Sequence, residues 1–278
     1  MLKRKRAGGL VRLSQQVVLL LGLSFFIFPV FWLISSSFKH DVDIFSLPVK
    51  LLAFQPTLAN FARVLETTTI PRLALNSLFT AGANVVLSLL IGTLAAYGIS
   101  RRHIRGQSLL LWFLGVRMFP PIVAAVPLFM VAAALRLVDT GLILPIVHLL
   151  MNVPFTIWMM KSFIDDVPLE VEESALMDGC SHWTVLRRVV LPLIRPGLVA
   201  TGVFCFIFSW NEFLLATVFT QRVATTLPIG ISSFVTKEQI LWGPLTASAT
   251  LATLPPMALA WIFNRYLVRG LTFGAVKP

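Results

Sequence analysis

Six apolar segments, each about as long as a bilayer-spanning helix of roughly 20 residues, are what most constrain the fold of this chain. They lie at about 17–34, 73–99, 108–131, 141–160, 197–217 and 245–266, and the third is expected to be broken by Pro120-Pro121 and by Pro127. Only 13% of the residues are charged, about half the share found in an ordinary soluble domain. A soluble fold of 278 residues has no interior large enough for so much apolar surface. The sequence therefore predicts an integral membrane protein with helical spans, because a helix satisfies its own backbone hydrogen bonds in lipid.

The distribution of basic residues predicts the orientation of these spans. The chain carries 23 Lys and Arg against 12 Asp and Glu, a net charge of +11. With both termini in the cytoplasm, the basic start at 3–6, Arg101 and the pair Arg187 and Arg188 fall on the cytoplasmic side, where loops concentrate Lys and Arg. Topology therefore explains the basic excess better than nucleic-acid binding does. The prediction is an all-α polytopic membrane protein with six transmembrane helices and both termini cytoplasmic.

Several classes of function lack their sequence signatures. Cys180 and Cys205 are the only cysteines, and with no CxxC or Cys/His cluster they indicate neither a disulfide framework nor a metal site. No phosphate-binding G-x-x-x-x-G-K-[ST] loop occurs, and no HExxH, GxSxG or paired intramembrane Asp motif suggests an enzyme. A secondary transporter or channel remains the main rival, although an ion relay would have only Arg117 and Glu212 as strong members. The first apolar segment is longer than a signal-peptide core and lacks a clean cleavage site, so we expect it to be a span.

The loop at 162–195, between the fourth and fifth apolar segments, holds half of the acidic residues. Pro168 suits the first position of a short helix, Gly179 suits its end, and Ser181 suits the N-cap of a second helix. The apolar face of that second helix is expected to consist of Val185, Leu186, Val189 and Val190. Pro192 and Pro196 should break the chain before the fifth span. The loop therefore predicts two short helices joined by a glycine turn on the cytoplasmic surface.

Fixed spacing within this loop carries a family resemblance. Glu173-Ser174-Ala175, Gly179, Val189 and Leu191-Pro192 stand at the spacing EAA-x3-G-x9-I-x-L-P. This resembles the cytoplasmic signature of permease subunits in binding-protein-dependent ABC importers, with Ser174, Val189 and Cys180 as conservative departures. Other motifs look like the carbohydrate-uptake, maltose-type branch: Asn76-Ser77, Ala96-Tyr97-Gly98, Phe119-Pro120-Pro121, Trp210-Asn211-Glu212-Phe213 and 270–277. Arg117 and Pro278 depart from that branch.

The resemblance implies a type I ABC importer permease fold, a single transmembrane domain of residues 1–278 in a bacterial inner membrane. It implies a non-catalytic subunit that forms half of the pathway for a sugar or sugar derivative. The implied partners are a second homologous permease, a dimer of ATPase subunits that holds ATP and Mg²⁺, an extracytoplasmic substrate-binding protein and membrane lipid. The chain itself is expected to bind no cofactor, metal or nucleic acid.

The resemblance also assigns a coupling role to the 162–195 loop, whose short helix docks in a groove of the ATPase in this family. The expected contact residues are Glu173, Ser174, Ala175, Leu176, Met177, Asp178, Gly179, Cys180 and Ser181. Glu172 is expected to join Glu173 and Asp178 in supplying charges at the rim of this contact. The tail at 270–278 is expected to reach the ATPase, and the outer loop at 218–243 to face the binding protein.

Polar residues within the spans are candidates for the substrate pathway, because such groups face the protein interior or a cavity. Arg117 in the third span has three possible roles: a charge pair with Glu212, a snorkelling position, or contact with sugar hydroxyls or an anionic sugar. His148 and Asn152 share one helix face, which suits either an interhelical hydrogen bond or a sugar contact. Trp210, Asn211 and Glu212 suit sugar stacking and hydroxyl binding, an interfacial position, or contact with the partner permease. The stripe Thr80, Asn84, Ser88, Gly92 and Ala96 favours close helix packing over a pathway lining.

Overall fold

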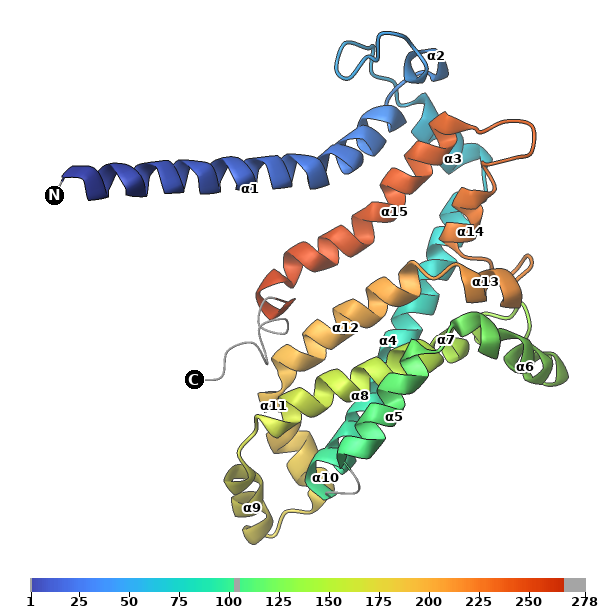
Figure 1. The fold of residues 1–278 in the computed structure, drawn as a ribbon. Helices are drawn as coiled ribbons and strands as arrows, with labels where there is room; N and C mark the ends of the chain where they lie inside the picture. Colours follow the sequence, from blue (N-terminus) through green and yellow to red (C-terminus); the bar gives the residue numbers. More distant parts are fainter. Residues whose placement is uncertain (1, 103–105, 268–278) are drawn as a thin grey trace. The chain divides into compact units, whose positions relative to one another are not determined.

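The computed structural model describes residues 2–102 and 106–267, which are mostly helical (Figure 1). The contacts between residues divide the chain into two compact units. Unit 1 consists of residues 1–69 and 231–251, and unit 2 consists of residues 70–230 and 252–278. Each unit is described by itself.

Unit 1 contains three helices and the first half of a fourth: α1 (Leu2–Ser37), α2 (Asp41–Ile44), α3 (Ala59–Thr67) and α15 (Trp242–Ile262). The Asn60 side chain of α3 donates hydrogen bonds to the carbonyl oxygens of Ser37 (3.1 Å) and Lys39 (2.8 Å), so it holds the end of α1. The Lys39 ammonium lies 4.7 Å from the ring centre of Trp32. The side chain of Lys39 is buried, and this aromatic contact offsets part of the cost of burying its charge.

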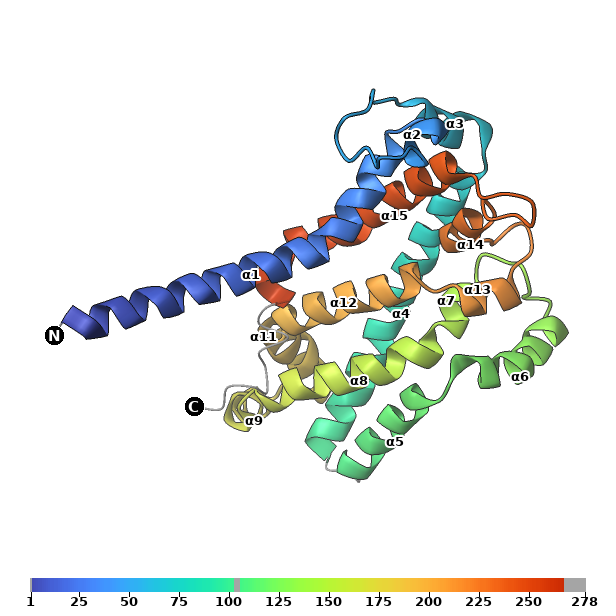
Figure 2. The ribbon, with the colours of Figure 1, turned by 45° about the horizontal axis from the view of Figure 1, so that its top comes forward.

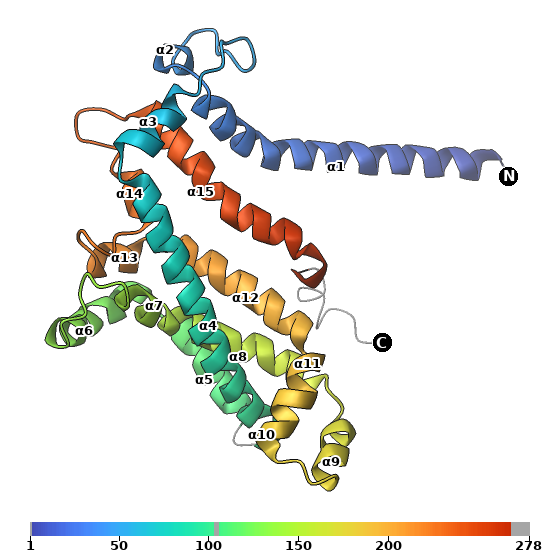
Figure 3. The same ribbon diagram turned by 180° about the vertical axis from the view of Figure 1, so that it is seen from behind.

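Unit 2 is built around α4, a helix of 33 residues (Figure 3). Its elements are α4 (Ile70–Arg102), α5 (Gly106–Met118), α6 (Pro121–Ala134), α7 (Ile143–Val147), α8 (Leu149–Asp165), α9 (Leu169–Met177), α10 (His182–Val185), η1 (Leu186–Val190), α11 (Leu191–Leu193), α12 (Arg195–Trp210), α13 (Leu214–Phe219) and α14 (Leu227–Ser232). The last two residues of α14 belong to unit 1, and the second half of α15 belongs to unit 2. α4 packs against α8 and α12, and α5 packs against α8. Figures 1 and 3 place α9 and α10 at one end of this unit and α6 and α13 at the opposite end.

The small-residue stripe of α4 forms the contact with α8. Asn84, Ser88 and Ala96 have no exposed surface. A Cβ atom at Gly92 would lie 2.5 Å from Cγ2 of Thr156 in α8, which is closer than two such atoms approach. The stripe therefore serves helix packing, as the sequence favours, because only a glycine lets the backbones come this close.

Two apolar clusters stabilise the opposite ends of unit 2. The first joins α4, α8 and α12 to the segment that follows α9, with Met160, Ile164, Val185 and Val190 fully buried. The second joins α6, α7 and α13 around Leu144, Leu215 and Phe219. The predicted apolar face at 185–190 is thus buried against the spans, which fixes the second short helix of the loop to the helix bundle.

The candidate membrane spans agree in part with the six predicted from the sequence. Three helices are long and apolar enough to cross a membrane: Val11–Ser37, Ile70–Arg101 and Trp242–Ile262. Two further pairs, Ser108–Met118 with Pro121–Ala134 and His182–Leu193 with Arg195–Trp210, reach this length only together and bend by 89° and 78°. The described residues therefore contain three to five candidate spans by length and composition. The fourth predicted segment forms α7 and the 17-residue α8.

Prolines shape the third and fifth predicted spans. The third bends between α5 and α6, where Pro120 precedes and Pro121 begins the second helix (Figure 2). The expected break at Pro127 is wrong, since this residue lies inside α6. Pro192 and Pro196 lie in the first turns of α11 and α12 and flank the bend at Ile194, as predicted. Proline is accommodated in a first turn because its missing N–H has no helical partner there.

The contact at Gly92 generates a stability prediction. Gly92→Ala should destabilise the protein by about 1–3 kcal/mol, because the added methyl group overpacks the contact with Thr156. Gly82→Ala is the matched control in the same helix, where a Cβ meets no atom within 4 Å. The measurement is the thermal unfolding midpoint of the purified protein. Adding Thr156→Ser should restore part of the loss; equal midpoints for Gly92→Ala and Gly82→Ala would contradict the packing argument.

Candidate functional site

The predicted coupling loop folds into two short helices around a glycine turn. The N–H of Gly179 donates to the carbonyl of Leu176 (3.0 Å), and the N–H of Cys180 donates to that of Ala175 (3.1 Å). These two bonds form a Schellman motif, which requires a left-handed residue, and Gly179 has φ of +84°. Ser181 then caps α10 by accepting a hydrogen bond from the N–H of Thr184 (3.3 Å), as predicted. Pro168 is the N-cap of α9 rather than its first helical residue.

The outer face of this turn is exposed. Glu173, Ser174 and Asp178 are exposed, and Met177 retains 88% of its accessible surface. Trp183, at the start of α10, is also exposed, at 59%. Ala175, Leu176 and Cys180 are partly buried against the chain's own core. Six of the nine predicted contact residues therefore lie on the outer face: Glu173, Ser174, Met177, Asp178, Gly179 and Ser181.

Glu172 does not belong to this exposed face, so its predicted role as a rim charge is wrong. Its carboxylate is buried and pairs with Arg101 of α4, with Nη2 2.6 Å and Nε 2.7 Å from Oε1. Tyr97, one turn earlier in α4, donates its hydroxyl to Oε2 (2.9 Å). Glu172 lies one turn before Ala175 and Leu176, so it projects from the inward face of α9.

A second group of polar residues lies buried between the helices of unit 2. Nδ1 of His148 lies 2.6 Å from the hydroxyl oxygen of Ser209, and Nε2 lies 3.5 Å from the carboxylate of Glu212. Glu212 also accepts hydrogen bonds from the N–H groups of Leu215 (2.8 Å) and Ala216 (2.9 Å) at the start of α13. A carboxylate is favourable there because the first N–H groups of a helix have no helical partners.

Asn152 extends this network toward α4 and α12. Its side-chain amide donates to Oδ1 of Asn84 (2.5 Å) and to the carbonyl of Cys205 (3.1 Å). Asn84 in turn donates to the carbonyl of Pro145 in α7 (2.9 Å). His148 and Asn152 are 2% and 1% exposed. The interhelical hydrogen bonds considered for them are therefore present, and contact with substrate stays a prediction.

The Trp210-Asn211-Glu212 motif divides between the interior and the surface. The Trp210 ring stacks on Phe206 with centroids 5.5 Å apart, and its Nε1 donates to the carbonyl of Ala252 (3.1 Å). Trp210 is 3% exposed, so its ring faces are not free for a sugar in this conformation. Asn211 is exposed, and its amide donates to the carbonyl of Ile207 (2.9 Å).

Arg117 lies in the last turn of α5, and the structure does not pair it with Glu212. Its guanidinium lies between two rings, 4.6 Å from the centre of Phe155 in α8 and 4.7 Å from that of Phe208 in α12. Nη1 donates a long hydrogen bond, 3.4 Å, to the carbonyl of Met151. Of the three roles considered for Arg117, the pairing with Glu212 is not formed here, because Glu212 is occupied by His148 and the start of α13. Among the ion pairs of the described residues, none includes Arg117.

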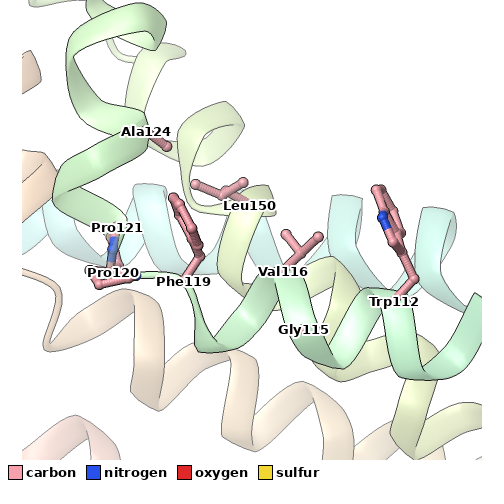
Figure 4. A pocket seen from close by; sticks show the side chains of 8 residues that line it. All are labelled: Trp112, Gly115, Val116, Phe119, Pro120, Pro121, Ala124 and Leu150. Atoms are coloured by element: carbon pink, nitrogen blue, oxygen red, sulfur yellow. The ribbon is translucent and has the colours of Figure 1, made fainter.

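A cavity of about 380 Å³ opens at the bend between α5 and α6. Figure 4 shows the side chains that surround it: Trp112, Gly115, Val116, Phe119, Pro120, Pro121, Ala124 and Leu150. The α5 residues among them recur every three or four positions and so occupy one face of that helix. Arg117 lies on a different face, which contacts α8 and α12. The cavity is therefore apolar and aromatic, and it is separate from the charge of Arg117.

At the opposite end of unit 2 from α9, Asp139 organises the loop after α13. Its carboxylate accepts hydrogen bonds of 3.0–3.1 Å from the N–H groups of the four consecutive residues Gln221, Arg222, Val223 and Ala224. Partial burial opposes the ionised form, but these backbone bonds outweigh it and lower the pKa of Asp139 below its ordinary value. Asn76 of α4 donates to the carbonyls of Val223 (2.8 Å) and Thr225 (2.9 Å). The loop is thus held in one shape.

Sequence reasoning missed two of these arrangements. Tyr97 and Arg101 are spaced by four residues and so share a face of α4, which is the signal that could have indicated a buried acidic partner. Asp139 left no comparable signal, because its four donors are about 82 residues away and meet it only through the tertiary fold. The predicted contact segment at 270–278 lies outside the residues that the structure describes.

Comparison with solved structures identifies the fold. The chain matches a structure titled as a bacterial ABC transporter involved in the import of the acidic polysaccharide alginate, with a TM-score of 0.79. The match has 20% sequence identity and covers 94% of this chain and 98% of that one. The chain therefore has the fold of a chain in that ABC transporter.

The sequence comparisons identify the family. The profile described as the binding-protein-dependent transport system inner membrane component matches residues 88–273, and the chain belongs to this family. It is 38% identical to a probable ABC transporter permease protein, y4oR, of Sinorhizobium fredii over 91% of both chains. It is 34% identical to the trehalose/maltose transport system permease protein MalG of Thermococcus litoralis, over 90% of this chain and 91% of that one. The chain is thus a non-catalytic inner-membrane permease component of an ABC importer, which confirms the family and function predicted from the sequence.

The Asp139 loop generates a pH prediction. Because the pKa of Asp139 is lowered in the folded protein, its stabilising effect is complete above the ordinary value of about 4 and disappears as the pH falls through the lowered value. At neutral pH, Asp139→Asn should lower the free energy of local opening of residues 221–224 by about 1.5 kcal/mol, because a hydrogen bond to a charged group contributes about this much.

Amide hydrogen exchange of the loop measures this effect, and Glu238→Gln is the control because Glu238 is an exposed carboxylate. At neutral pH the loop amides should be less protected in Asp139→Asn than in the wild type. On acidification the protection of the wild-type loop should fall toward that of the variant. A wild-type loop whose protection is unchanged well below pH 4 would contradict the role of the carboxylate.

Proposed function

We propose that this permease forms half of a sugar pathway and is driven by a separate ATPase through the turn between α9 and α10. The observation that carries the proposal is the exposed face of this turn, where Glu173, Met177 and Asp178 surround a left-handed Gly179. An exposed apolar side chain flanked by charges is typical of a docking contact. The segment after the turn is packed into the helix core through Val185 and Val190, so a movement of the turn would also move the spans.

The proposed topology has six spans with both termini in the cytoplasm: α1, α4, α5 with α6, α7 with α8, α12 and α15. Arg101, Lys161 and the pair Arg187 and Arg188 lie at the α9 end of unit 2, and this basic bias supports a cytoplasmic location for that end. The ATPase dimer, which holds ATP and Mg²⁺, would dock there. The Asp139-bound loop at the opposite end would then face outward, toward the binding protein.

The proposed complex contains a second homologous permease, since one chain supplies half of the pathway. The cargo is a sugar or sugar derivative, as the similarity to a trehalose/maltose permease supports. Of the six predicted pathway residues, Arg117 and Asn211 retain exposed or partly exposed side chains and are the proposed cargo contacts. His148, Asn152, Trp210 and Glu212 would support the pathway wall, because each is engaged by neighbouring helices.

Arg117 supports a cargo that carries a negative group. Phe155 and Phe208 hold its guanidinium by their ring faces, an interaction that leaves the edge donors available. A charge at this position is costly and needs a partner in some step of the cycle. A carboxylate, sulfonate or phosphate on a sugar fits the planar donors of arginine better than a neutral hydroxyl does.

The coupling proposal is tested with Gly179→Arg in the reconstituted complex. A Cβ at Gly179 meets no atom within 4 Å, so the substitution should disturb only the local backbone, by about 1–2 kcal/mol. The arginine side chain would project from the docking face. The affinity for the ATPase, followed by co-purification, should therefore fall about tenfold or more, which corresponds to ~1.4 kcal/mol. Gly179→Asn is the control, because asparagine tolerates a positive φ. Normal ATPase binding and transport in Gly179→Arg would refute the docking role.

The cargo proposal is tested with Arg117→Gln and a panel of paired neutral and acidic sugars. Uptake of the acidic member should fall by about tenfold or more, because leaving a buried charge without its partner costs about 2 kcal/mol or more. Uptake of the neutral member should change much less. Arg63→Gln is the control, since Arg63 is exposed in α3. An equal loss for both sugars would show a structural role for Arg117 instead.

A further inference from the structure

We infer that the buried pair Arg101–Glu172 makes α4 and the coupling helix α9 move as one body during transport. The inference rests on the proposed function, in which the ATPase displaces α9. It assigns Arg101 and Glu172 as positioning residues that transmit this displacement to α4, a helix far from α9 in the sequence, and it assigns Tyr97 the role of orienting the carboxylate.

The geometry of the pair is that of a rigid connection. Nη2 and Nε of Arg101 both lie within 2.7 Å of Oε1 of Glu172, while the Tyr97 hydroxyl holds Oε2 at 2.9 Å. Both carboxylate oxygens are therefore engaged by α4. The planar guanidinium fixes direction as well as distance, which a flexible ammonium group would not do.

Arg101 also fixes the point where α8 leads into α9. Its Nη2 donates to the carbonyls of Ile164 (2.8 Å) and Val167 (2.9 Å), in and just after the last turn of α8. One side chain of α4 thus holds the end of α8, the connecting residue and α9 together. The chain itself links α9 only to α8 and α10, so this side chain adds a third, non-sequential connection.

Burial distinguishes this pair from an ordinary surface contact. The side chains of Arg101 and Glu172 are 12% and 6% exposed. In the same region Asp165 contacts both Ser100 and Lys161, but Asp165 is exposed. Water and salt weaken an exposed pair, whereas a buried charge that loses its partner is strongly unfavourable. The Arg101–Glu172 connection should therefore persist through a cycle in which exposed contacts exchange.

The direct test measures a distance in the reconstituted complex with its binding protein and ATPase. Spin labels are placed at Glu170→Cys in the first turn of α9 and Leu94→Cys in α4, both exposed positions, with Cys180→Ser as background. In wild type the distance distribution should be narrow and the same in the nucleotide-free and ATP-bound states. A shift larger than its width, in a complex that still transports, would overturn the inference.

The functional test separates transmission from simple stability. Glu172→Gln should keep the ATPase bound and its basal hydrolysis near normal, yet lower the substrate imported per ATP by about fivefold or more. It should also broaden the label distribution. Tyr97→Phe, which removes only one hydroxyl group, should produce a smaller effect in the same direction and covers the case in which Glu172→Gln fails to fold. Asp166→Asn is the control, since Asp166 is an exposed carboxylate in the same loop.

The double variant Arg101→Gln/Glu172→Gln completes the test. Two amides can hydrogen-bond without leaving a charge buried, so import per ATP should recover part of the loss seen in Glu172→Gln. Unchanged import per ATP in Glu172→Gln and Tyr97→Phe would refute the inference while leaving the proposed coupling site intact. A wild-type complex without ATP-driven import would instead refute the proposed function itself.

Discussion

Polar side chains buried between apolar helices must find partners within the protein, and this requirement fixes how α4, α8 and α12 pack. Asn152 of α8 donates to both Asn84 of α4 and the carbonyl of Cys205 in α12, so one amide sets the register of three helices. Gly92 permits the backbone approach that brings these groups within hydrogen-bond distance. In lipid, where apolar contact alone favours no particular register, such bonds and small residues decide the arrangement.

The same requirement explains how buried and partly buried carboxylates help to order the two ends of unit 2, beside the apolar clusters there. At one end the carboxylate of Glu172 joins α9 to α4 through Arg101, and at the other end Asp139 gathers four consecutive N–H groups of a distant loop. Each carboxylate engages donors from a segment remote in sequence. Between these ends, α4, α8 and α12 pack against one another.

The sequence predicted the membrane class and the glycine turn after α9 because both depend on local information. Apolar length determines a span, and Gly179 with Ser181 determines a helix end and the next helix start within a few residues. The predicted break at Pro127 was wrong, because a proline inside an apolar helix is tolerated when its surroundings accommodate the carbonyl that loses its hydrogen bond. The predicted rim position of Glu172 was wrong, because the exposure of this side chain depends on which face of α9 meets α4.

What the sequence by itself determined was therefore the helical membrane class, the family resemblance and the position of the glycine turn between α9 and α10. The tertiary structure alone decided which polar groups meet. It paired Glu212 with His148 rather than with Arg117, and it placed Arg117 between Phe155 and Phe208. The physical reason is that hydropathy and spacing fix an element and its faces, whereas the partner of a buried charge depends on how separate helices are rotated and staggered against one another.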